Sequence, residues 1–161
     1  MEPESKNTFD FASWLVGFID GEGCFCLSFS ERERLTLKIE VRPSFSVSQN
    51  SKSMKILETM NTYFGCGGVR HSKRENTHKY EVRNLNHLTT VIIPFFRKYP
   101  LLTNKQKDFL LFDQACMIIK ENRHLSKEGL KEILQLAAQM NTSGTRKNSI
   151  VNLLNILDLD S

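Results

Sequence analysis

The segment Trp14-Leu15-Val16-Gly17-Phe18-Ile19-Asp20-Gly21-Glu22-Gly23 combines a helical apolar pattern with an acidic, glycine-rich end. The larger apolar side chains recur at the spacing of one helix face: Phe11, Trp14, Leu15, Phe18 and Ile19. A second face carries smaller side chains: Ala12, Ser13, Val16 and Gly17. Two such faces predict two partners, a core beneath the helix and a closely approaching backbone such as a second copy of this helix. Gly21 and Gly23 predict the helix end, so two carboxylates lie at a tip that two helices can share.

The length and composition predict one soluble domain over residues 1–161, with residues 1–7 as a flexible tail. No apolar run approaches the roughly 20 residues that span a membrane. The acidic start Met1-Glu2-Pro3-Glu4 lacks the basic region of a presequence, so we expect the protein to act where it is made. The cysteines show no paired Cys-x-x-Cys spacing, which predicts reduced thiols rather than structural zinc.

The net charge of +4 is unevenly distributed along the chain. Only one of the 22 basic residues lies within residues 1–31, whereas six of the 18 acidic residues lie there. The remainder is therefore strongly basic, which suits a polyanionic partner, although a lysine-rich solvated surface also produces a mildly basic protein.

Two segments alternate between apolar and polar residues with the period of a β-strand. Residues 24–30 alternate first, residues 31–34 turn the chain, and a longer alternation runs from Leu35 to Val47. A period of two sustained over this length predicts a sheet with one face on a core and one face in water. Pro43 removes a ladder hydrogen bond, so we expect an edge or a bend at that position.

The rest of the chain predicts a second hairpin and several helices. The hairpin covers residues 69–72 and 79–83, around a polar turn. Helices are predicted over residues 52–64 with Gly65 as C-cap, 87–93 ended by Pro94, 104–121, a segment with Ser126 as N-cap, and 149–159. The predicted fold is therefore α+β, in the order helix-hairpin-helix-hairpin-helix, with a four-stranded antiparallel curved sheet covered on one face by helices. The acidic helix end formed by Asp20 and Glu22 occurs once in the sequence.

The polar parity of the predicted strands mixes cations, acids and hydroxyl groups. The major groove of duplex DNA admits a two-stranded ribbon, and its bases are read by Arg or Lys, by acids and by hydroxyl groups. The aromatic residues lie on the opposite parity, which favours duplex over single-stranded nucleic acid. A merely solvated sheet face would show comparable charge, so both interpretations stay open. The candidate DNA-binding residues are Cys26, Ser28, Ser30, Arg32, Arg34, Lys38, Glu40, Arg42, Ser44, Ser46, Ser48, Arg70, Ser72, Lys79 and Glu81.

The segment from Leu15 to Gly23 resembles the signature of the LAGLIDADG homing endonuclease family, with Val16 for the first Ala and Glu22 for the last acid. Three further segments are similar to that family, in the same order along the chain: Val47-Ser48-Gln49, Asn104-Lys105-Gln106-Lys107, and residues 141–148. The resemblance implies the LAGLIDADG endonuclease fold over 1–161, in the single-motif, homodimeric form. Without it, the segment is an amphipathic helix that ends at a glycine turn.

The residue types at the tip suit a hard divalent cation. Hydrolysis of a phosphodiester needs a metal that neutralises charge and polarises a phosphoryl oxygen, and a water in line with the leaving group. The Glu22 carboxylate and the Gly21 carbonyl suit Mg²⁺ (or Mn²⁺) better than a thiolate-binding metal. One carboxylate gives a metal ion too few protein ligands, so two chains are expected to bring two Glu22 residues together. The predicted dimer interface consists of Ser13, Val16, Gly17 and Asp20, with Asp20 chiefly shaping the helix end.

The resemblance implies the remaining site residues. Gln49 lies near the metal, where it orders solvent, and Lys105 points to the scissile phosphates, so Glu22, Gln49 and Lys105 form the expected catalytic set. Without the motif, Gln49 and Lys105 are ordinary surface residues. A late loop is expected to grip the DNA backbone through Ser143, Thr145, Arg146 and Lys147.

The resemblance implies a site-specific homing endonuclease that binds a long pseudo-palindromic duplex as a homodimer and cuts each strand once, leaving 3′ extensions. The family resemblance alone implies that the protein is encoded in an intron and located in a chloroplast or mitochondrion. We expect it to bind neither a membrane nor a small-molecule substrate. Two alternatives remain, an RNA-binding intron maturase and a DNA-binding protein that has lost cleavage. The second is kept open by Glu22, one methylene longer than the usual Asp, and by Ser53, where relatives often carry Arg or Lys.

Overall fold

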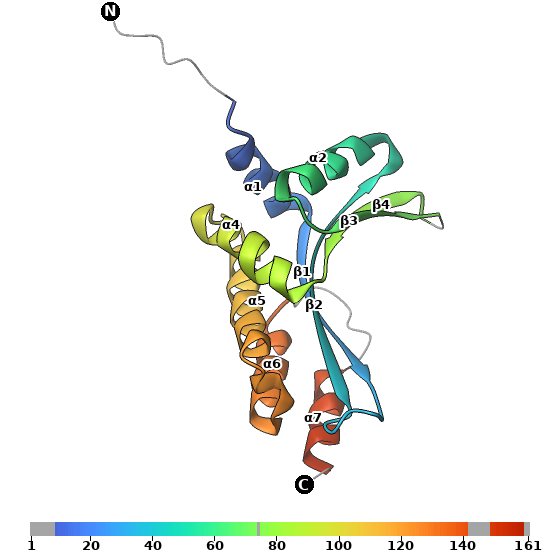
Figure 1. Ribbon diagram of the computed structural model, residues 1–161, viewed down its shortest axis with the longest axis vertical. Helices are drawn as coiled ribbons and strands as arrows, with labels where there is room; N and C mark the ends of the chain where they lie inside the picture. Colours follow the sequence, from blue (N-terminus) through green and yellow to red (C-terminus); the bar gives the residue numbers. More distant parts are fainter. Residues whose placement is uncertain (1–8, 74, 142–148, 160–161) are drawn as a thin grey trace, which may run out of the picture.

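The computed structural model describes residues 9–73, 75–141 and 149–159 (Figure 1). The expected tail over residues 1–7 lies outside the described residues, as do Ser143, Thr145, Arg146 and Lys147. The elements follow in the order α1 (Phe11–Glu22), β1 (Gly23–Glu31), β2 (Ile39–Asn50), η1 (Ser51–Ser53), α2 (Met54–Phe64), β3 (Gly68–Ser72), β4 (Thr77–Val82), α3 (Leu85–His87), η2 (Leu88–Ile92), α4 (Ile93–Lys98), α5 (Lys105–Lys120), η3 (Arg123–Leu125), α6 (Lys127–Ala138) and α7 (Ile150–Leu159). The predicted α+β order is confirmed.

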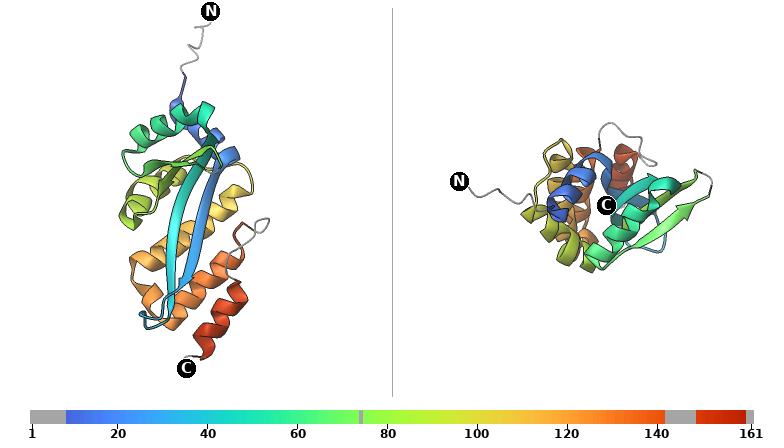
Figure 2. Two further views of the ribbon diagram at one scale, coloured as in Figure 1. Left: turned by 90° about the vertical axis from the view of Figure 1, so that its right-hand side faces the viewer. Right: turned by 90° about the horizontal axis from the view of Figure 1, so that it is seen from above.

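The four strands form one antiparallel sheet in the order β1-β2-β4-β3. The long strands β1 and β2 curve along the molecule, with α4, α5 and α6 on one side of them (Figures 1 and 2). Strand β4 pairs with β2 only from Phe45 to Asn50. Pro43 therefore lies where β2 has a neighbour on one side only, as expected of a residue without an N–H donor.

Aromatic side chains dominate the core between the sheet and the helices. The ring of Phe25 lies 5.3 Å from that of Phe45 and 5.2 Å from that of Phe96, measured between centroids. Phe109 and Phe112 complete the cluster, each 5.4 Å from Phe25. All five rings are at most 1% exposed, so truncating any one of them to Ala is expected to cost about 3–5 kcal/mol.

The first hairpin differs from its prediction at its tip. Strand β2 begins at Ile39 rather than at Leu35, and the connection is closed by the Arg32 N–H, which donates to the Lys38 carbonyl at 2.7 Å. Lys38 adopts a left-handed backbone with φ of 55°, a conformation that a strand residue cannot have. The alternation of residues 35–38 therefore reflects a turn, and Leu35 is 38% exposed.

The helices agree with their predictions except at Pro94. Gly65 ends α2 in the left-handed conformation, and the Ser126 hydroxyl accepts from the Gly129 N–H at the start of α6, as predicted. Pro94 does not end a helix, because it occupies the first turn of α4, where its missing N–H costs nothing, after a widened π turn in η2. Within the described ranges, no helix is long and apolar enough to cross a membrane.

Candidate functional site

The carboxylate of Glu22 lies where α1 passes directly into β1. Asp10 opens the helix by accepting from the backbone N–H groups of Ala12 and Ser13, each at 3.2 Å. Gly23 follows the helix in an extended conformation, and a Cβ there would lie 2.7 Å from the Ile19 carbonyl oxygen. Only glycine fits this close approach, which places Glu22 at the end of the helix and at the edge of the sheet.

Gln49 contacts Glu22 from the end of β2. Its Nε2 donates to Glu22 Oε2 at 3.1 Å, although the two residues are 27 positions apart in the chain. The two side chains border a shallow polar depression with Ser48, Asn50 and Thr77. The structure therefore joins two of the three predicted catalytic residues directly.

Lys105 reaches the same tip from the start of α5. Its Nζ donates to the carbonyl oxygens of Ile19 and Gly21, each at 3.2 Å, so the ammonium lies against the negative end of the α1 dipole. Burial lowers the pKa of the Lys105 ammonium, and the nearby carboxylates of Asp20 and Glu22 oppose that effect. The Gly21 carbonyl, predicted as a metal ligand, is thus also the contact of the predicted catalytic lysine.

Asp20 fastens the segment before α5 to the tip. Its carboxylate accepts from the Leu102 N–H at 2.8 Å, and from the Thr103 N–H and hydroxyl at 3.1 and 2.5 Å. Burial alone would raise the pKa of the Asp20 carboxyl, but these hydrogen bonds outweigh it and hold that pKa below its usual value. Asp20 therefore ties the tip to the segment before α5, and its partner Thr103 was not among the predicted site residues. The two lie 83 positions apart, and no local pattern joins them.

The donor set at the tip suits a hard cation only in part. Glu22 offers a carboxylate and Gly21 a backbone carbonyl, the oxygen ligands that Mg²⁺ and Mn²⁺ accept. Among the residues that the structure describes, no group of three or more His, Cys, Asp or Glu side chains could hold a metal. One chain therefore supplies an incomplete set that fits a divalent cation only if another unit, water or phosphate adds oxygens.

The predicted DNA-binding residues of the strands share one face of the sheet. The register pairs Cys26 with Ser44, Ser46 with Glu81, and Arg70 with Lys79, which places all of them on the same side. Arg32, Arg34 and Lys38 are exceptions, because they lie in the connection at the hairpin tip.

Three members of this polar face are buried, contrary to the prediction. Ser44, Ser46 and Glu81 are 9%, 5% and 7% exposed. The longer side chains of Arg42 and Arg70 on the same face are exposed. Short hydroxyl side chains in the middle of the sheet therefore form its floor rather than its contact surface.

The two acids of the polar face are already paired with cations of the same chain. Glu81 forms ion pairs with Arg70, with Lys79 at 3.6 Å and with Arg83 at 3.0 Å. Glu40 accepts from Arg32 at 3.0 Å and pairs with Arg42 at 2.9 Å. These acids therefore hold the arginines around them in place.

The faces of α1 are divided differently from the prediction. Ala12, Leu15, Val16 and Ile19 are buried, whereas Trp14 is 41% exposed. Val16, predicted at the dimer interface, is 9% exposed and packs in the chain's own core, because a helical period places it beside Ala12 and Ile19. Ser13 and Gly17 remain exposed, and a Cβ at Gly17 would meet nothing within 4 Å.

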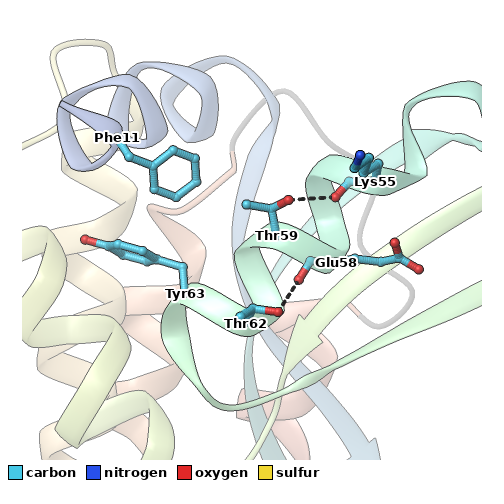
Figure 3. A pocket seen from close by; sticks show the side chains of 6 residues that line it. All are labelled: Phe11, Lys55, Glu58, Thr59, Thr62 and Tyr63. Carbon is cyan, nitrogen blue, oxygen red and sulfur yellow. Dashed lines mark hydrogen bonds between the residues drawn. The ribbon is translucent and has the colours of Figure 1, made fainter. Parts of the chain in front are cut away.

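An apolar hollow between α1 and α2 contains none of the predicted site residues (Figure 3). The rings of Phe11 and Tyr63 meet edge to face across it, with centroids 5.1 Å apart. The hydroxyl groups of Thr59 and Thr62 donate to backbone carbonyls of α2 itself. The predicted catalytic residues lie at the opposite end of α1, around Glu22.

The fold and the site define a class of proteins in which one helix carries an acid to the edge of a four-stranded antiparallel sheet, beside a lysine and a glutamine. The model of the family described as LAGLIDADG endonuclease matches residues 15–116. The chain belongs to this family.

Similar proteins include both short and long chains. "Probable intron-encoded endonuclease 2" from Neurospora crassa is 33% identical over 145 residues, which are 88% of this chain and 32% of that protein. The chain spans about a third or less of the first curated relatives. "Homing endonuclease I-ApeII" from Aeropyrum pernix is 26% identical over 91% of this chain and 90% of its own length.

Similar solved structures also include chains of about the length of this one and chains about twice as long. The homing endonuclease I-TnaI superposes with a TM-score of 0.80 at 31% identity, covering 93% of this chain and 97% of that one. I-SmaMI bound to uncleaved DNA target in the presence of calcium ions superposes with a TM-score of 0.83 at 31% identity, covering 93% of this chain and 49% of that one.

Proposed function

We propose that this chain is a site-specific homing DNA endonuclease that hydrolyses phosphodiester bonds in double-stranded DNA. The observation that carries the proposal is the set of contacts at the α1 tip. Gln49 donates to the Glu22 carboxylate, and Lys105 donates to the carbonyl of the adjacent Gly21. Family membership supports the same reaction class.

The residues of the tip have separate roles in this reaction. Glu22 and the Gly21 carbonyl would hold Mg²⁺ or Mn²⁺, which when bound neutralises phosphate charge and lowers the pKa of water. Gln49 keeps the Glu22 carboxylate oriented and offers its amide to solvent beside it. Lys105 supplies a positive charge next to the phosphate, and burial strengthens that charge's interaction with the developing negative charge.

The active species is proposed to be a homodimer joined through α1. The exposed Ser13 and Gly17 let a second helix approach closely, whereas Val16 serves the core of each chain. Two α1 tips side by side would bring two Glu22 carboxylates together and complete the oxygen set. Chain lengths support this, because the chain covers nearly all of I-TnaI but about half of I-SmaMI.

The polar face of the sheet is proposed to bind a long pseudo-palindromic duplex, because a two-fold protein requires a two-fold site. Arg42 and Arg70 are exposed and held by acids, so they present fixed guanidinium groups to base edges. The tip is proposed to cut each strand once, and the family resemblance implies that the products have 3′ extensions. I-SmaMI, whose structure was determined with its DNA target, supports duplex DNA as the partner.

The gene is proposed to lie within an intron of an organellar genome. Several similar proteins carry intron in their names, among them the "Uncharacterized cox1 intron-2 37.2 kDa protein" of Schizosaccharomyces pombe. Sequencing the genomic flanks of the coding segment tests this proposal, and uninterrupted nuclear flanks would contradict it.

The decisive experiment replaces Glu22 by Gln, which keeps the shape and removes the charge. With Mg²⁺ present, nicking and cleavage of a target duplex should fall at least about 100-fold, while binding of the same duplex persists. The matched control is Glu58→Gln, since Glu58 is an exposed acid on α2, and it should cut like the unaltered protein. Full cleavage by the Glu22 variant would contradict the assignment.

The same assay separates the alternative functions. An unaltered protein that binds duplex DNA but cuts with neither Mg²⁺ nor Mn²⁺ would be a cleavage-inactive DNA-binding protein. If intron RNA displaced the duplex at lower concentration than unlabelled duplex does, the chain would be a maturase. One chain per duplex in sedimentation would contradict the homodimer.

A further inference from the structure

Two histidines stack across the β3–β4 hairpin, away from the polar face. His71 pairs with His78 in the register, and their ring centroids lie 4.4 Å apart with an interplanar angle of 20°. Their chain neighbours Arg70 and Lys79 point to the opposite side. His78 also pairs with Gln49 of β2, so Gln49, His78 and His71 form a row on one face.

One edge of this histidine pair is held by side chains of the neighbouring loops. Nδ1 of His78 lies 3.3 Å from the hydroxyl of Ser51, which in turn donates to the Asn76 side-chain oxygen at 2.8 Å. A hydroxyl fixed in this way orients the imidazole and leaves its Nε2 for another partner. Outer partners of this kind orient metal-binding histidines in proteins generally.

We propose that His71 and His78 form a second metal site, which takes a divalent transition-metal ion such as Zn²⁺, Ni²⁺ or Cu²⁺. Imidazole nitrogens suit these ions, whereas the oxygens of the α1 tip suit Mg²⁺. The site is therefore chemically distinct from the proposed catalytic cation site. Water completes the coordination, because no third ligand-type side chain joins the pair among the described residues.

The two side chains are close enough to reach one ion, although their rings must reorient to bind it. At metal–nitrogen distances of about 2.0–2.1 Å, two nitrogens on a tetrahedral ion lie about 3.3 Å apart. The stacked rings have centroids 4.4 Å apart and are tilted by only 20°, so they must turn out of the stack before a nitrogen of each ring can face one ion. His71 is exposed and has room for this movement, while Ser51 holds His78 in place.

A bound ion would link β3 to β4 on the side opposite Arg70, Lys79 and the buried Glu81. Its effect is to stabilise the hairpin that carries these cations, because an ion that binds only the folded hairpin favours it. Metal binding by His71 and His78 requires neither DNA nor Glu22. Its test is therefore separate from the test of the proposed nuclease activity.

The test measures Cu²⁺ and Ni²⁺ binding to the full chain without DNA. It uses a Cys24→Ser, Cys26→Ser background, because these thiols are partly accessible and bind the same ions. Electron paramagnetic resonance should show two imidazole nitrogens on one Cu²⁺, and calorimetry should show one Ni²⁺ per chain. His71→Ala and His78→Ala should each weaken Ni²⁺ binding by at least roughly tenfold, and Ser51→Ala should have a smaller effect.

Matched controls make each outcome decisive. His87→Ala removes a histidine in α3 and should leave Ni²⁺ affinity unchanged. Circular dichroism establishes that each variant folds. His71→Asn serves as a milder replacement if the His71→Ala variant does not fold. Unchanged Ni²⁺ binding in a folded His71 or His78 variant, or a single imidazole nitrogen on Cu²⁺, would overturn the proposal.

Discussion

The tip of α1 and the polar face of the sheet are both rich in charge, but different forces hold them together. The tip depends on a few hydrogen bonds between distant segments, such as those of Asp20 with Thr103 and of Lys105 with Gly21. The polar face depends on clusters in which one acid serves several cations, as Glu81 does. Substitutions at the tip should therefore act sharply on the reaction, whereas substitutions on the sheet should act gradually on binding and stability.

The largest effect is expected at Lys105. Lys105→Ala removes the cation beside the Gly21 carbonyl, and the cleavage rate should fall roughly 100-fold or more while DNA binding changes little. Single-turnover cleavage of a bound duplex measures this. Lys107→Ala, on the exposed side of the same helix turn, is the control. Equal losses in both variants would show that Lys105 contributes only general charge.

A second prediction concerns the buried acid of the sheet. Glu81→Gln leaves Arg70, Lys79 and Arg83 without their common partner, so the free energy of unfolding should fall by about 1–3 kcal/mol. Non-specific duplex binding should strengthen at low salt and depend more steeply on salt. Glu40→Gln provides the comparison, with a loss below about 1 kcal/mol because its cluster is exposed. Urea unfolding and salt titrations measure both quantities, and equal destabilisation would contradict the difference in burial.

Asp20 should contribute to the stability of the protein in a pH-dependent way. Asp20→Ala removes three accepted hydrogen bonds and should lower stability at pH 7 by about 1–2 kcal/mol. The Asp20 pKa is depressed in the folded protein, so this stabilisation is present above the ordinary carboxyl pKa of about 3.9 and is lost as pH falls through the folded value. The stability difference between the two proteins should therefore shrink in strong acid. A difference that did not shrink there would indicate packing rather than charge.

The smallest effect should come from Gly17 within α1, which looks in sequence like Gly23 directly after the helix. Gly17→Ala meets open space in a helix and should stabilise the isolated chain by roughly 0.5–1 kcal/mol, while it weakens the proposed dimer. Gly23→Ala places a Cβ 2.7 Å from the Ile19 carbonyl oxygen and should destabilise the chain by about 1–3 kcal/mol. Thermal unfolding and sedimentation measure both changes. Stabilisation by both alanines would contradict the close approach at Gly23.

Much of this fold follows from local patterns. The long alternation predicted strands, and Gly65 and Ser126 marked helix ends because each acts through its own backbone or its neighbours. The predictions were wrong where a local pattern had two solutions. Residues 35–38 alternate like a strand but close a turn, and Pro94 can either end a helix or occupy its first turn.

The sequence by itself determined the acid at the end of α1, the two faces of the sheet and the residue types available for chemistry, because these depend on helical and strand periods. The tertiary structure alone decided that Lys105 donates to the Gly21 carbonyl, that Thr103 binds Asp20, and that Val16 is buried while Trp14 is not. The contacts of Lys105 with Gly21 and of Thr103 with Asp20 join segments more than 80 residues apart. No periodicity encodes such contacts, since they arise only when the helices pack on the sheet.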